Sequence, residues 1–155
     1  MVGDATCACV YTLSMPAPGD MSVKAVYFNH PDVAVVTWDP TLEAVHVEWQ
    51  GWASSTEGAA CLEAGLRALV EHNASRWLVD GRAMKAVKKA DQDWIDHDWF
   101  PRVLAAGLRR MAVVNPVSGL AKMNIEDILA RVAGSILQVG HFATVDEARA
   151  WLAGT

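Results

Sequence analysis

The chain has 155 residues, of which 52% are hydrophobic and 20% are charged, and its formal net charge is −5. The length is typical of one domain, and the composition is that of a folded globular protein rather than a disordered chain. The acidic balance argues against binding to nucleic acid, which needs a basic surface, and no apolar run approaches the roughly 18 residues of a membrane span.

The N-terminal segment differs from the rest of the chain. Residues 15–21 are rich in the Pro and Gly of turns and linkers, so we expect an extension at 1–22 and one domain over 23–155. Residues 9–13 can add a strand. No positive charge precedes Lys24, which argues against a secretory signal, and the three cysteines lack metal-binding spacing. We expect a cytoplasmic protein with reduced thiols, no metal and no cofactor.

Three strands are predicted first, at residues 24–28, 33–38 and 44–50, with turns between them. In the third strand Val45, Val47 and Trp49 alternate with polar residues, a pattern typical of a half-exposed antiparallel strand.

The hydrophobic period then changes to that of a helix. Ser54 and Glu57 have the spacing of a capping box, and Asn73 is a reasonable stop for the helix that they open. A buried strand is predicted at 77–80. Asp91 can cap the next helix, and Pro101 must kink or restart it because proline cannot occupy a straight helix interior.

The remaining elements continue this alternation. A strand is predicted at 109–114, a helix ending at Gly134, a strand at 136–139, and a last helix opened by a capping box of Thr144 and Glu147. The order predicts an α/β fold with a mixed sheet, in which antiparallel N-terminal strands precede parallel β-α-β units.

Ligands of such sheets bind beyond the carboxyl ends of the parallel strands. These ends are predicted to be Asp80-Gly81-Arg82, Asn115-Pro116 and Gly140-His141.

Five motifs occur in a characteristic order. They are Trp49-x-Gly51 with Ser54 and Glu57; Leu78-Val79-Asp80-x-Arg82; Asp93-Trp94 followed by Pro101; Gly107-x-x-Arg110-x-Ala112-Val113-Val114; and Phe142-x-Thr144-x-x-Glu147-Ala148-x-x-Trp151-Leu152. In these motifs the chain resembles the SpoIIAA-like family of STAS-related domains, from about residue 26 to residue 152.

The resemblance implies about four helices, mainly on one face of the sheet, and kinship to anti-sigma-factor antagonists and to the CRAL-TRIO-type lipid-binding fold. STAS antagonists carry a phosphorylatable Ser just after an Asp in the loop that follows a central strand. Here the loop begins Asp80-Gly81-Arg82 and contains no Ser or Thr up to Lys85. A phosphorylation switch is therefore not expected.

The first functional hypothesis is a non-enzymatic binding or regulatory module that binds a protein partner or a small ligand near the loop after residues 77–80. Asp80 and Arg82 can bind a polar group, or they can simply pair locally. Lys85 belongs to a short basic run that can steer an anion or can be a solvated face. Asn115 ends the neighbouring strand.

Two alternatives remain. The domain can carry a small apolar or lipid-like ligand in a pocket walled by Trp94, Trp99 and Phe100, although these residues can equally be ordinary core. It can also be a hydrolase-type enzyme that uses Asp93 and His97, which are one helical turn apart. Exposed Trp side chains or strand edges would support a homodimer.

Overall fold

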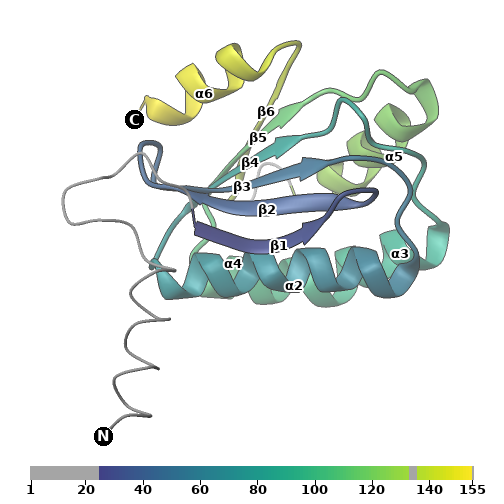
Figure 1. The fold of residues 1–155 in the computed structure, drawn as a ribbon, viewed down its shortest axis with the longest axis horizontal. Helices are drawn as coiled ribbons and strands as arrows, with labels where there is room; N and C mark the ends of the chain where they lie inside the picture. Colours follow the sequence, from purple (N-terminus) through teal and green to yellow (C-terminus); the bar gives the residue numbers. More distant parts are fainter. Residues whose placement is uncertain (1–24, 133–135, 155) are drawn as a thin grey trace, which may run out of the picture.

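Six strands form one sheet whose spatial order follows the chain (Figure 1). The computed structural model describes residues 25–132 and 136–154. The strands are β1 (Ala25–His30), β2 (Ala34–Asp39), β3 (Ala44–Trp49), β4 (Arg76–Asp80), β5 (Arg110–Val114) and β6 (Gln138–Phe142). Strands β1 to β3 pair antiparallel and β3 to β6 pair parallel, which confirms the predicted mixed sheet. The predicted extension at 1–22, with its strand at 9–13, and Gly134 lie outside the described residues.

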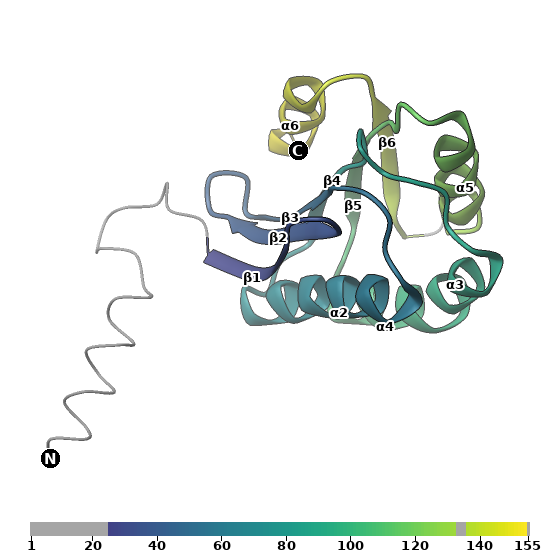
Figure 2. The same cartoon turned by 45° about the vertical axis from the view of Figure 1, so that its right-hand side comes forward.

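The helices cover the two faces of the sheet unequally. They are α2 (Ser55–Glu71), α3 (Lys89–Trp94), the π-helical segment η1 (Ile95–Trp99), α4 (Phe100–Ala106), α5 (Gly119–Ala130) and α6 (Val145–Ala153). Helices α2 to α5 pack on one face, and α6 is the only helix of the described residues that lies across the other (Figures 1 and 2). Because α3, η1 and α4 are continuous, residues 25–132 and 136–154 form four helical units, in agreement with the family resemblance. Within the described residues, no helix combines the length and the apolar character needed to cross a membrane.

The larger core lies between the sheet and helices α2 to α5. Trp77 of β4 and Trp99 of η1 are its largest buried side chains, and their rings meet edge to face with centroids 5.2 Å apart. Gly65 of α2 faces Trp77 so closely that an added Cβ would lie 2.3 Å from the indole ring. A smaller core joins α6 to the opposite face through Leu78, Leu152 and their neighbours.

Both predicted capping boxes are present. The Ser54 hydroxyl accepts the N–H of Glu57, whose carboxylate accepts the N–H of Ser54. Thr144 and Glu147 do the same at the start of α6. Helix α2 ends one residue before its cap at His72, and Asn73 has a φ of 50°, a left-handed conformation that asparagine tolerates.

The kinked helix and the last strand differ from the sequence-based expectation. Helix α3 begins after Lys88, so Asp91 lies in its first turn and is not the cap. The π-helical turn directly precedes Pro101, so the helix changes its hydrogen-bond pattern at the point where proline has no N–H to donate.

Strand β6 is shifted from the predicted 136–139, so Gly140 and His141 lie inside it rather than after it. Glycine does not end this strand. It makes room for aromatic packing, because a Cβ at Gly140 would lie 2.7 Å from the Phe142 ring.

Candidate functional site

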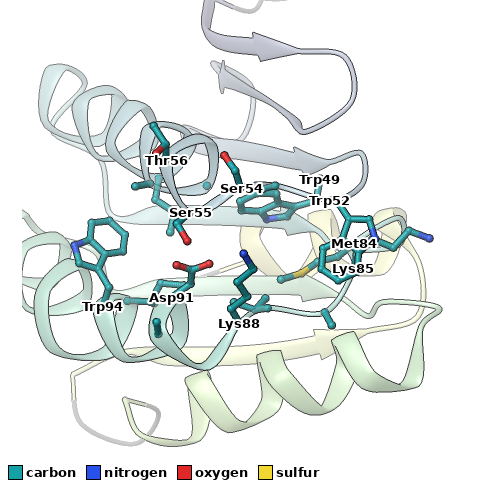
Figure 3. Close-up of a pocket in the computed structure, with 18 of the residues that line it drawn as sticks. Trp49, Trp52, Ser54, Ser55, Thr56, Met84, Lys85, Lys88, Asp91 and Trp94 are labelled. Carbon is teal, nitrogen blue, oxygen red and sulfur yellow. The ribbon is translucent and has the colours of Figure 1, made fainter.

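A cavity of about 530 Å³ opens beyond the carboxyl ends of β3 and β4. Its walls come from the β3–α2 loop, the first turns of α2, the loop after β4, and the α3–η1 segment (Figure 3). The main apolar contributors are Trp49, Trp52, Leu62, Met84, Trp94 and Ile95. The cavity has the size and the apolar character of small-molecule sites, and it lies where open α/β sheets bind ligands.

Hydrogen bonds fix the loop after β4. The N–H of Gly81 donates to Val114 O at 3.0 Å, and a Cβ at this position would lie 2.9 Å from that same oxygen. At the far end, the N–H of Val87 donates to the Asn124 side chain and the Gln92 amide donates to Val87 O. The loop is therefore held to β5, α5 and α3, and Met84 between the two anchors is turned into the protein at 8% exposure.

Three polar side chains converge at the mouth of the cavity. Figure 3 shows the Lys88 amino group and the Asp91 carboxylate facing the Ser55 hydroxyl, while Lys85 extends away from the centre. Neither Lys88 nor Asp91 forms an ion pair with another described residue. Both charges are thus available to a ligand that enters between α2 and α3.

Asp80 and Arg82 lie outside this cavity and pair with each other. The guanidinium donates from Nε to Asp80 Oδ1 at 2.9 Å and from Nη2 to Oδ2 at 2.7 Å. Burial of Asp80 tends to raise the pKa of its carboxyl, but the hydrogen bonds from Arg82 outweigh that effect and the pKa lies below its usual value. The pair lines a shallower depression of about 270 Å³ that shares Trp49 with the main cavity.

The other predicted site residues divide between the cavity wall and the core. Lys85 and Trp94 line the cavity. Trp99 is buried beneath it, where its indole N–H donates to Leu62 O at 3.1 Å, and Phe100 packs against Trp99. Asn115 donates its backbone N–H to Phe142 O and lines neither hollow.

Asp93 and His97 do not meet through their side chains. The Asp93 carboxylate accepts from Lys89 Nζ at 2.8 Å, whereas His97 Nδ1 lies 2.9 Å from the backbone oxygen of Asp93. No cluster of three or more potential metal ligands occurs in the described part of the chain. Burial raises the pKa of the Cys61 thiol to about 12, so this cysteine stays protonated. The Asp93 carboxylate therefore does not hydrogen-bond the His97 ring, whose Nε2 atom lies 3.8 Å from Asp96 Oδ2.

Most of the wall residues were not among the predicted site residues, including Trp49, Trp52, Ser55, Met84 and Lys88. The sequence carried a partial signal in Trp52, a large apolar residue in a Gly-containing loop and 60% exposed in the fold. Nothing in the local sequence indicated that this loop faces residues 84–88.

A family model for SpoIIAA-like proteins matches residues 44–153, from β3 through α6. The chain belongs to the SpoIIAA-like family. This membership confirms the resemblance drawn from the five motifs, and domains of this STAS-type family are typically regulatory binding modules. The match covers every wall of the cavity. No curated protein and no solved structure matches the chain significantly.

Proposed function

We propose that this SpoIIAA-like protein is a non-enzymatic module that binds a small, largely apolar ligand in the cavity between α2 and α3. The cavity itself carries this proposal: it holds about 530 Å³ behind a wall of aromatic and aliphatic side chains. Its position agrees with the first hypothesis, because residues 84–88 after β4 form one side. Its apolar character agrees with the carrier hypothesis, with Trp94 in the wall and Trp99 as support beneath it.

A pocket-filling substitution tests the proposal. A Cβ at Gly58 would lie 3.7 Å from Ala53 Cβ, an ordinary contact, so Gly58→Leu places its side chain at the cavity wall without forcing the backbone. We expect native mass spectrometry of the freshly purified protein to show a non-covalent adduct, and decanol to bind in isothermal titration calorimetry. Gly58→Leu is expected to abolish the adduct and to weaken decanol binding by at least about tenfold.

Gly119→Leu is the matched control, since Gly119 also lies in a first helical turn, has no atom within 4 Å of its added Cβ and does not line the cavity. It should bind decanol like the wild type. A bare chain mass together with no decanol binding, or equal binding by both leucine variants, would reject the proposal.

A protein-partner site around Arg82 is the second candidate. Its support is that Arg82 is 55% exposed while its partner Asp80 is nearly buried, and that Glu48 and Gln50 extend the polar surface beside them. Binding at this depression would be weakened by Arg82→Ala and unaffected by Gly58→Leu, which separates it from the cavity proposal.

A further inference from the structure

We infer that the ligand of this cavity carries one carboxylate on an apolar body, and that Lys88 and the start of α2 bind the carboxylate. This inference rests on the proposed function and adds the chemical class of the ligand. It follows from the charged groups at the mouth of the cavity, whose surroundings can be described one by one.

The three lysines near the mouth differ in their surroundings. Lys89 donates to the Asp93 carboxylate at 2.8 Å, and its charge is already matched. Lys88 lines the cavity, and among the described residues its amino group has no carboxylate partner (Figure 3). Lys85 also lines the cavity but points away from its centre. Lys88 is therefore the cation placed to meet a ligand.

The first turn of α2 faces Lys88 and attracts the same charge. The capping box uses the N–H groups of Ser54 and Glu57, while those of Ser55 and Thr56 have no acceptor within the described residues. Both residues line the cavity, at the positive end of a 17-residue helix. Free N–H groups at such a helix end favour a bound anion, and the facing ammonium group adds to that preference.

Asp91 limits how much negative charge the mouth accepts. Its carboxylate lies beside Lys88 in the cavity wall and, within the described structure, has no cation of its own (Figure 3). A phosphate monoester carries between one and two negative charges near neutral pH, whereas a carboxylate carries one. Repulsion from Asp91 therefore favours the carboxylate, while the aromatic and aliphatic wall accepts the apolar body.

Four probes with one alkyl chain length test the inference by isothermal titration calorimetry: decanoate, decanol, decyl phosphate and decylamine. Decanoate is expected to bind at least about fivefold more tightly than decanol, with decyl phosphate weaker than decanoate and decylamine weakest. Lys88→Met, which removes the charge and keeps an unbranched side chain one atom shorter, should reduce decanoate affinity about fivefold and change decanol affinity less than about twofold.

Lys89→Met is the control, because it removes a neighbouring positive charge that does not line the cavity. It should leave decanoate affinity within about twofold of wild type at moderate salt, since Lys89 is exposed and its ammonium group pairs with Asp93. If decanol binds as tightly as decanoate and Gly58→Leu blocks both, the carboxylate inference fails while the proposed function stands. If no probe binds and native mass spectrometry shows the bare chain mass, the proposed function fails. Equal losses in Lys88→Met and Lys89→Met would also overturn the inference.

Discussion

At the scale of single residues, the loop after β4 begins with an ion pair that is asymmetric in exposure. The Asp80 side chain is 6% exposed, whereas Arg82 is 55% exposed and reaches back to cover it with two side-chain hydrogen bonds. Asp80 also accepts the backbone N–H of Arg82. The Asp80–Arg82 pair therefore closes the turn that leads to the cavity wall. It holds the loop after β4 in position in addition to its electrostatic contribution.

The lowered pKa of Asp80 gives a prediction with a defined sign. Because the folded state binds a proton less readily than the unfolded state, the pair stabilises the fold fully above the ordinary pKa of 3.8, and this stabilisation is lost as pH falls through the lowered value. With Arg82 half exposed, we expect Asp80→Asn to cost about 1 kcal/mol at neutral pH. The difference from wild type should shrink in urea unfolding below about pH 4.

Asp98→Asn is the control for this prediction. Asp98 pairs with Arg102 at the surface, with 53% and 40% of the two side chains exposed, so its loss should cost less than about 0.5 kcal/mol at neutral pH. A destabilisation by Asp80→Asn that stays constant from neutral to acidic pH would show that the ion pair does not act through its charge.

At the scale of elements, the contact of α2 with β4 depends on the absence of a side chain at Gly65. The Trp77 ring occupies the space that a Cβ would need, and Trp77 is only 1% exposed with Trp99 against it. Trp99 in turn donates to Leu62 O of α2. The two tryptophans therefore determine how closely α2, whose first turns line the cavity, packs on the sheet.

Gly65→Ala should destabilise the protein by about 1–3 kcal/mol, because the buried indole cannot move away from the new methyl group and overpacking strains the contact. Gly119→Ala serves as the reference, since its added Cβ meets no atom within 4 Å and alanine favours helices. That variant should be neutral or more stable by less than about 1 kcal/mol. Midpoints of urea unfolding measure both; equal midpoints would contradict the packing argument.

At the scale of the whole molecule, α6 is the only helix in the described chain that covers the second face of the sheet. It is held at three places: Leu152 packs in the smaller core, Arg149 donates to the buried Asp39 at 2.6 Å, and Arg110 donates to Trp151 O while stacking on the Trp151 ring. The second face thus contributes to stability at a distance from the cavity.

Leu152→Ala tests this contribution. Leu152 is fully buried, so its truncation should cost about 2–4 kcal/mol through lost apolar contact and the cavity left behind. Leu120→Ala makes the same change on α5 at a side chain that is 58% exposed, and it should cost less than about 0.5 kcal/mol. Thermal unfolding followed by circular dichroism measures the pair. If Leu152→Ala lowers the unfolding temperature as little as Leu120→Ala does, α6 adds little to the stability of the fold.

Much of this architecture could be predicted from local signals. The capping boxes at Ser54 and Thr144, the alternation of Val45 and Val47, and the turn at Asn73 each reflect a neighbour only a few residues away. The predicted strand boundary at Gly140 is wrong because the reason for that glycine lies in the packing of Phe142 and Trp151 around it. Such packing is a property of the folded chain.

The cavity was harder to foresee for the same reason. Trp94 and Trp99 lie on one kinked helix and were expected together in a pocket wall, yet one lines the cavity and the other fills the core. Ser55 and Lys88 are 33 positions apart by their numbers and line the same cavity because β4 pairs parallel to β3. No short-range pattern in the sequence encodes that meeting.

The π-helical turn between α3 and α4 has one more consequence. A π turn closes its hydrogen bond one residue later than an α turn, as the N–H of Phe100 does to Ile95 O. The segment therefore contains one residue more than a regular helix would need. Removing it would rotate α3 by about 100° relative to α4. This rotation would move Trp94, Asp91 and Lys88 together. The extra residue thus determines the direction in which the side chains of α3 point.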